Sequence, residues 1–270
     1  MQFFTSFKRL MYQACGYLWY VCTARHRRGY GLHSPFMFWF HQQVLSSGYR
    51  KKLKRLTNRT RTLLRDHRTI ACEDNPGAGS SLLRTDREKL PHIVRRSSVS
   101  YKYGKLLYAA ALEFKPATIL EMGTSVGIST MYLCEGAPQA QVYTIEACPE
   151  KLAICRENAR LMGHNNLHPV QGTFQQVLPG LLEQLSSPDM VFIDGDHQKE
   201  KILGYFEHII PYIHDDSLVI LDDIHWSRQM SQAWQTITQH PRVRVSVDLF
   251  RMGILFFKRE LSPERFTLAY

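Results

Sequence analysis

The chain has 270 residues, of which 44% are hydrophobic and 21% are charged, a balance typical of a folded globular protein rather than a disordered one. Its 16 glycines and 12 prolines are ordinary proportions, which excludes collagen-like and low-complexity sequences. No run of about 18 apolar residues is present, so the sequence predicts no membrane-spanning helix.

The positive charge is concentrated at the front of the chain. Residues 1–70 contain 14 Lys and Arg against one acidic residue, Asp66, whereas the other 200 residues contain 20 basic and 23 acidic side chains. The net charge of +10 therefore comes from the front of the chain, and this asymmetry indicates a segment with its own task or partner.

Residues 1–95 show helix-like patches broken by turn signals and predict a basic helical extension or lid. Basic residues 25–68 have two interpretations: a contact with nucleic acid or anionic lipid, or a solvated helix face. Within them, residues 50–68 interleave Lys and Arg with leucines spaced as one helical face. We interpret the aromatic segment 33–40 as core or as a lid over a substrate, and the loop 75–81 as a flexible lid.

Six cysteines occur without a C-x-x-C pair or a zinc-like spacing with histidines, so we expect a cytoplasmic protein without disulfides. The stretch 10–24 follows two basic residues and superficially resembles a signal peptide. Its polar and ring-bearing side chains and the lack of a clean cleavage site favour an amphipathic helix packed on its own domain. A helix lying on a membrane surface is the alternative.

A second region, predicted as one domain over residues 96–270, alternates short β-rich runs with helical segments. This alternation predicts an α/β fold with a mostly parallel sheet of seven strands. The last two runs have little between them, which is typical of a terminal antiparallel hairpin. The predicted strands cover residues 118–123, 141–146, 168–171, 190–194, 218–222, 244–250 and 252–258. The predicted helices cover residues 128–135, 149–162, 174–185, 199–213 and 228–240.

The ends of the first two predicted strands suit a ligand that carries a ribose. Gly123 and Gly127 let the backbone turn sharply and approach a ligand closely after the first strand. Their spacing is not G-x-G-x-x-G, which gives little support to a dinucleotide site. The second strand ends at Glu146, where an acid can accept both hydroxyls of a ribose.

The string ILEMGTSVGIST (119–130), followed by VYTIEA (142–147), resembles the cofactor-binding half of the class I S-adenosylmethionine-dependent methyltransferases. The resemblance covers residues 100–258 and implies a Rossmann-like seven-stranded sheet with S-adenosylmethionine as the cofactor. It implies that Glu146 holds the ribose hydroxyls and that Ala147 lies beside the adenine. No acid follows the third strand at 172–174, where the family often places one near the adenine amino group. The remaining residues expected to bind the cofactor are Glu121, Gly123, Thr124, Ser125, Gly127, Ser129, Gly172 and Asp194.

Paired carboxylates follow the fourth and fifth predicted strands, and such groups repel one another unless a cation pairs with them. An all-oxygen site suits Mg²⁺, whereas helix capping by these aspartates is the alternative interpretation. The arrangement is similar to that of the metal-dependent O-methyltransferases acting on catechols and sugars. This resemblance implies Asp194, Asp222 and Asp223 as Mg²⁺ ligands and Asp196 as the general base, with His197 as a competing base.

The sequence thus predicts an enzyme that transfers a methyl group from S-adenosylmethionine to a hydroxyl of a small molecule or glycan, assisted by a divalent metal. The alternative is an RNA methyltransferase that uses the basic N-terminal region as a substrate arm. Against base methylation, the fourth strand is followed by Asp-Gly-Asp-His rather than an Asn/Asp-Pro-Pro-aromatic loop. A binding module with a vestigial cofactor site is a further alternative, which the intact glycines and acids disfavour.

Overall fold

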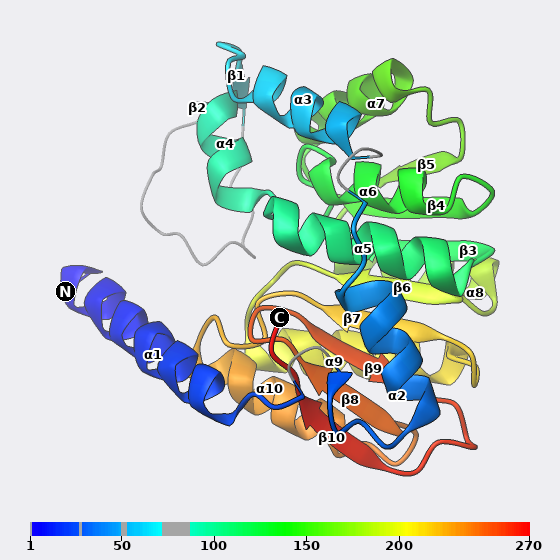
Figure 1. Cartoon of the computed structure of the whole chain (residues 1–270). Coiled ribbons are helices and arrows are strands. Elements are labelled where there is room, and N and C mark those ends of the chain that lie inside the picture. Colours follow the sequence, from blue (N-terminus) through cyan, green and yellow to red (C-terminus); the bar gives the residue numbers. More distant parts are fainter. Residues whose placement is uncertain (1, 27–28, 50–52, 72–86) are drawn as a thin grey trace.

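The computed structural model describes residues 2–26, 29–49, 53–71 and 87–270. The loop 75–81, interpreted above as a lid, lies outside the described residues. So do five members of the basic stretch, at positions 27–28 and 50–52. Among the described residues, one large sheet forms the centre of the molecule and helices cover both of its faces (Figure 1).

The sheet has eight strands in the order β10-β8-β9-β7-β6-β3-β4-β5. All pairings from β7 to β5 are parallel, whereas β9 is antiparallel to both of its neighbours, β7 and β8. The predicted α/β fold with a terminal hairpin is therefore confirmed. The strands are β3 (Thr118–Met122), β4 (Gln141–Glu146), β5 (Leu167–Gln171), β6 (Met190–Ile193), β7 (Leu218–Leu221), β8 (Val245–Asp248), β9 (Gly253–Phe256) and β10 (Glu264–Thr267).

The sequence analysis did not predict β10, which adds an eighth strand parallel to β8 at the edge of the sheet. Its four residues, ERFT, are exposed or only half-buried. A strand of this kind lacks the apolar run by which the central strands are recognised, because an edge strand has little surface to bury.

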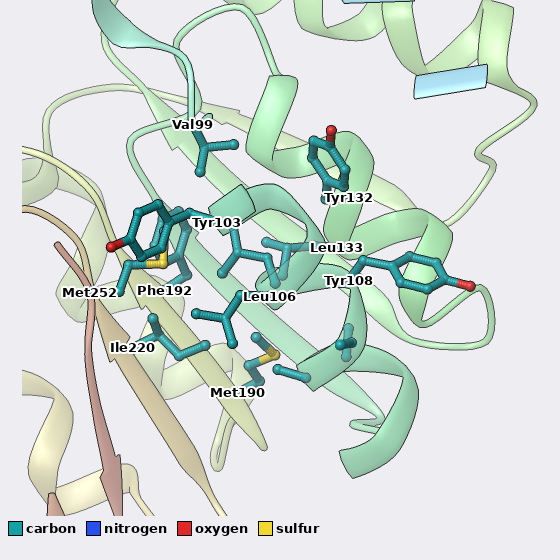
Figure 2. Close-up of a cluster of buried hydrophobic side chains, with 14 of the residues drawn as sticks. Val99, Tyr103, Leu106, Tyr108, Tyr132, Leu133, Met190, Phe192, Ile220 and Met252 are labelled. Atoms are coloured by element: carbon teal, nitrogen blue, oxygen red, sulfur yellow. The ribbon is translucent and has the colours of Figure 1, made fainter. Parts of the chain in front are cut away.

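The central strands are buried on both faces, which explains their continuous apolar sequences. On β6, Met190 and Phe192 pack on one side of the sheet, while Val191 and Ile193 pack on the other. Figure 2 shows the first side, where the side chains of β6 and β7 meet those of two helices and the hairpin. The helices of this side are α5 (Tyr101–Phe114), α6 (Ile128–Gly136) and α7 (Pro149–Met162), and those of the opposite side are α8 (Phe174–Leu185), α9 (Lys199–Ile209) and α10 (Arg228–Thr238).

The front of the chain packs onto the first side of the sheet. The short helix α2 is capped by the Ser34 hydroxyl, and its Phe36 and Phe40 rings contact Phe256 of β9 edge-on at 4.9 and 5.2 Å. Met37 and Phe40 of the aromatic segment are therefore core, whereas Phe38 is exposed. The division of the chain at residue 95 stays a prediction. The elements before it are α1 (Gln2–Thr23), α2 (Pro35–Phe40), η2 (His41–Leu45), α3 (Lys54–Leu63), α4 (Leu90–Ser97) and the two-stranded sheet of β1 (Thr69–Ala71) and β2 (Arg87–Lys89).

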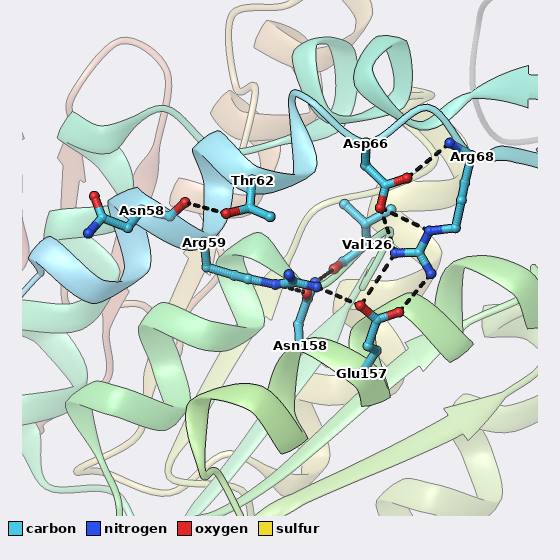
Figure 3. Close-up of polar contacts among 8 residues, drawn as sticks. All are labelled: Asn58, Arg59, Thr62, Asp66, Arg68, Val126, Glu157 and Asn158. Carbon is cyan, nitrogen blue, oxygen red and sulfur yellow. Dashed lines mark hydrogen bonds and ion pairs between the residues drawn. The ribbon is translucent and has the colours of Figure 1, made fainter.

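The predicted basic helix is α3, and Leu53, Leu56 and Leu63 are buried beneath it, as their spacing indicates. Arginines of this region bind the protein itself. The Arg59 guanidinium donates to Asn158 at 2.7 Å and to Glu157 at 2.8 Å on α7 (Figure 3). Arg68 donates to the same Glu157 carboxylate at 2.7 Å.

The helix α1 contacts its own domain. Its Tyr20 hydroxyl donates to the carbonyl of Leu268 at 2.5 Å, and its Tyr12 hydroxyl donates to Ser231 of α10 at 2.8 Å. Among the residues that the structure describes, no helix is long and apolar enough to cross a membrane. The outer face of α1 is exposed at Leu18 and Trp19.

Candidate active site

The turn after β3 depends on two glycines. Gly123 has a φ of +107°, and a β-carbon there would collide with the carbonyl oxygen of Asp194 at the end of β6. Gly127 has a φ of +82°, and a β-carbon there would press against Cys155 of α7. Glycine satisfies both constraints because it adopts positive φ without strain and occupies no side-chain space. The turn therefore lies directly against the acid-bearing end of β6.

Glu146 lies at the end of β4 and fixes the same turn. Its carboxylate accepts hydrogen bonds from the main-chain amides of Ser125 at 2.8 Å and Cys148 at 2.9 Å. Gly172, at the end of β5, donates its amide to the Glu146 carbonyl at 3.0 Å, and Ala147 follows Glu146 in a half-buried position. The structure thus brings the glycine turn and the predicted ribose-binding acid together at one edge of the sheet.

Three other residues expected to bind the cofactor lie beneath the turn. Glu121 has no exposed surface, and its Oε2 accepts from the hydroxyls of Thr130 at 2.5 Å and Thr144 at 2.6 Å. Burial raises the pKa of the Glu121 carboxyl above its ordinary value. Thr124 and Ser129 are also buried. These side chains support the turn from the inside, which leaves its main chain to face a ligand.

The sequence analysis did not single out the contact between the turn and the end of α4. The hydroxyls of Ser97 and Ser125 share a hydrogen bond of 2.7 Å. The next residue, Ser98, has a buried hydroxyl with no partner among the described residues. The end of α4, which crosses the predicted domain boundary at residue 95, therefore reaches the glycine turn.

Three aspartates converge beyond β6 and β7, as predicted. Asp222 donates its amide to the Ile193 carbonyl at 2.9 Å, which places it beside the end of β6. Burial, reinforced by the neighbouring carboxylates, raises the pKa of Asp194 well above its ordinary value. Burial and the charge of Asp222 likewise raise the pKa of Asp223 to about 6. The ionised forms of Asp194 and Asp223 are thus disfavoured.

Arg251, which the sequence analysis did not identify, lies among these acids. Its Nε is 2.9 Å from Asp222 Oδ1, its Nη2 is 2.7 Å from Asp222 Oδ2, and its Nε is 3.5 Å from Asp223 Oδ1. Its position follows from the antiparallel register of β7 and β9, which pairs Leu221 with Gly253. Because this pairing joins strands that are far apart in the chain, no local sequence pattern around residue 251 predicts the contact.

The two candidate bases differ in their surroundings. Asp196 is already engaged, because its carboxylate accepts from the Tyr205 hydroxyl at 2.5 Å and from Lys201 Nζ at 3.2 Å. His197 faces the acids instead, with Nε2 at 3.9 Å from Asp194 Oδ1 and 3.7 Å from Asp223 Oδ2. Its Nδ1 is buried and has no hydrogen-bond partner among the described residues.

An aromatic wall adjoins His197. The centres of the Trp226 and His197 rings lie 6.3 Å apart. Trp226 also contacts α1, where the Arg9 guanidinium lies over the ring at 4.5 Å from its centre. Gln13 of α1 donates to the Trp226 carbonyl at 3.0 Å. The half-buried Trp226 thus stands between the candidate base and the N-terminal helix.

The predicted Mg²⁺ ligands, Asp194, Asp222 and Asp223, do not fit a divalent ion in this arrangement. Both carboxylate oxygens of Asp222 are taken by Arg251, and the Asp222 side chain has no exposed surface. Within the described ranges, no group of three or more His, Cys, Asp and Glu side chains is arranged to hold a metal ion. Their assignment as metal ligands is therefore not supported by the geometry.

Comparisons with known proteins agree with this site. A family described as a methyltransferase domain matches residues 120–224, which contain the glycine turn, Glu146 and the three aspartates. A catechol O-methyltransferase of Mycobacterium tuberculosis is 32% identical over 154 residues, 56% of this chain and 66% of that protein. Over this region the chain is similar to catechol O-methyltransferases, which are class I S-adenosylmethionine-dependent enzymes.

Other proteins are similar to this chain over the same region. A catechol O-methyltransferase of Niastella koreensis is 30% identical over 130 residues, 47% of this chain and 58% of that protein. The chain thus spans somewhat less than two thirds of these two curated relatives. The fold matches an O-methyltransferase from Bacillus cereus solved in complex with SAH, with a TM-score of 0.55 and 16% identity over 81% of this chain and 95% of that one.

Proposed function

We propose that this protein transfers the methyl group of S-adenosylmethionine to a hydroxyl of a small molecule, with an aromatic diol of the catechol type as the leading class. The observation that carries the proposal is the backbone contact between Gly123 and Asp194. This contact places the glycine turn, which suits the cofactor, next to the cluster of aspartates and His197, which suits proton transfer. The catechol O-methyltransferases among the relatives support the acceptor class.

The residues around Glu146 fit the cofactor. An ionised carboxylate offers about four lone-pair positions, and the amides of Ser125 and Cys148 occupy two of them. The other two remain for the hydroxyls of a ribose. The main chain of the glycine turn, which Gly123 and Gly127 allow to pack directly against Asp194 and Cys155, would hold the methionine half. S-adenosylmethionine, when bound, supplies an electrophilic methyl group on a sulfonium.

Alignment of the hydroxyl with that methyl group is the main demand of the reaction, and removal of the hydroxyl proton is the second. Because Nδ1 of His197 is buried, Nε2 is the nitrogen that can take this proton as the oxygen–carbon bond forms and the carbon–sulfur bond breaks. Asp223, whose pKa of about 6 leaves it mostly ionised at neutral pH, lies 3.7 Å from Nε2 and would stabilise the imidazolium. Asp196, held by Tyr205 and Lys201, positions the loop that carries His197.

The Trp226 ring favours a flat acceptor. It lies beside His197 and below the Arg9 guanidinium, so that an aromatic acceptor stacked on it would present a hydroxyl toward the base. Gln13 fixes the main chain of Trp226 from α1. The N-terminal helix therefore helps to build the acceptor side of the site.

The alternative of an RNA acceptor has less support. Arg59 and Arg68 bind Glu157, and Arg55 donates to the Met162 carbonyl at 3.2 Å, so these three cations attach α3 to α7. A substrate arm needs its cations free to neutralise phosphates. Labelled methyl groups in RNA after incubation with S-adenosylmethionine would favour this alternative.

Methyl transfer to a panel of catechols and other hydroxyl compounds, followed with methyl-labelled S-adenosylmethionine, tests the proposal. His197→Ala is expected to lower kcat by about 10²-fold or more while SAH affinity stays within about twofold, because the side chain acts on the acceptor proton. His208→Ala, on the exposed side of α9, is the matched control and should leave kcat unchanged. Transfer that is equal in the two variants would remove His197 from the mechanism.

A further inference from the structure

We propose that Arg251 is the resident cation of the acid cluster and that it keeps divalent metal ions away from Asp222, so that methyl transfer proceeds without a metal. The claim that methyl transfer needs no metal rests on the function proposed above, whereas the claim that Arg251 excludes metal ions does not. The geometry is a two-pronged contact: Nε and Nη2 of Arg251 meet the two oxygens of Asp222 at 2.9 and 2.7 Å. Such paired, charge-assisted hydrogen bonds are among the strongest in proteins.

The guanidinium is held in place by the turn between β8 and β9. The Arg251 amide donates to the Leu249 carbonyl at 3.0 Å, and the Arg251 carbonyl accepts from the Ile224 amide at 3.0 Å. The Tyr103 hydroxyl of α5 donates to the Leu249 carbonyl at 2.9 Å, and its ring centre lies 5.7 Å from the guanidinium carbon. Main-chain contacts on both sides of residue 251 therefore aim the side chain at Asp222.

A metal bound at the predicted ligands would have to displace this contact. Asp222 would lose both of its hydrogen bonds to Arg251, and its side chain has no exposed surface through which to turn toward another partner. The displaced guanidinium would also stay near the ion, because its main chain is fixed by Ile224 and Leu249. Two positive groups in a poorly solvated site repel strongly.

Arg251 also explains how three acidic side chains can lie close together. It neutralises Asp222 and lies within 3.5 Å of Asp223, which leaves Asp194 and His197 to face the reacting groups. A guanidinium remains positively charged across the pH range in which proteins function, so Arg251 neutralises Asp222 without a bound metal ion. The residual negative charge of the cluster is complementary to a sulfonium.

The test is direct binding of Mn²⁺, a spectroscopic stand-in for Mg²⁺, to the full chain by electron paramagnetic resonance. The wild type is expected to show no saturable site at millimolar Mn²⁺. Arg251→Gln, which frees Asp222 and removes one positive charge, is expected to bind Mn²⁺ about tenfold more tightly or better. The double variant Arg251→Gln, Asp222→Asn should lose that gain.

Arg251→Lys keeps the positive charge and should bind Mn²⁺ no better than the wild type. A saturable, EDTA-reversible Mn²⁺ site in the wild type that disappears in Asp222→Asn would overturn the proposal, whether or not the Arg251 variants fold. A failure to find any methyl acceptor would count against the proposed function alone, because Mn²⁺ binding is read without turnover. Once an acceptor is known, methyl transfer by the wild type should be the same with and without EDTA.

Discussion

Gly123 and Asp194 lie in backbone contact. The Asp194 amide donates to the carbonyl of Met122 at 2.8 Å, and the carbonyl oxygen of Asp194 fills the space in which a Gly123 side chain would begin. The glycine turn and the acid-bearing strand end are therefore joined through their main chains. Their spacing does not depend on any flexible side chain.

Gly123→Ala should damage both folding and cofactor binding. The β-carbon meets main chain rather than a movable side chain, and the φ of +107° is strained for alanine, so we expect a loss in the free energy of unfolding of about 3 kcal/mol or more. Denaturant unfolding measures the loss. Gly180→Ala is the control, because Gly180 lies in α8 with open space around it and should be neutral or stabilising. Equal stability of the two variants would show that the turn can relax.

Glu146→Gln should weaken the binding of SAH by about tenfold or more, since a neutral amide accepts ribose hydrogen bonds poorly. Its NH2 group would also replace one of the oxygens that accept from the amides of Ser125 and Cys148. Isothermal titration gives the affinity. Glu183→Gln, on the exposed side of α8, should change nothing. Unchanged SAH affinity in Glu146→Gln would place the ribose elsewhere.

Asp223→Asn should change how stability depends on pH. The pKa of Asp223 is raised from 3.8 to about 6, so ionisation of this carboxyl disfavours the folded state. Its contribution therefore falls as pH rises from about 4 to about 6 and stays low above that. Near neutral pH the variant should be more stable than the wild type by on the order of 2 kcal/mol. Denaturant unfolding across this pH range measures it, with the exposed Asp216→Asn as control.

The prediction would be contradicted if, relative to Asp223→Asn, the wild type became more stable as the pH rises through this range. The comparison isolates this carboxyl because asparagine keeps its size but never ionises.

Glu157→Gln should loosen α3 from α7. The carboxylate accepts from Arg59, whose side chain is 13% exposed, and from Arg68, whose side chain is 47% exposed, so the second contact is partly screened by solvent. We expect a loss of about 1 kcal/mol in the free energy of unfolding. Hydrogen bonds from Arg68 lower the pKa of Glu157, so the stabilisation is present above its ordinary value of 4.5 and is lost as pH falls below it.

Thermal unfolding at neutral and acidic pH checks this, with Glu207→Gln on the exposed side of α9 as the matched control. A difference between the two variants that persists at low pH would point to packing rather than charge.

The sequence predicted the fold well because the central strands are buried on both faces and their apolar runs stand out between helical segments. It missed β10, whose residues are polar and half-exposed. It also predicted that Asp194, Asp222 and Asp223 lie near one another, as they do in the structure, since the carboxyl ends of parallel strands meet at one edge. Arg251 could not be found in this way, because its contact with Asp222 arises from the antiparallel register of β7 and β9.

The two candidate bases could not be ranked from the sequence for a similar reason. Asp196 and His197 are adjacent in the chain, and their separate roles follow from partners on α9. Tyr205 and Lys201 hold the aspartate, whereas the imidazole turns toward the end of β7.

The most direct test of the account is transfer of labelled methyl from S-adenosylmethionine into a fractionated cell extract, with the wild type and His197→Ala compared in parallel. We predict that the wild type places label in the small-molecule fraction, as a methyl ether formed on a hydroxyl, and that His197→Ala does not. Label in the RNA fraction, equal for both proteins, would contradict the account and assign the basic N-terminal region to the substrate.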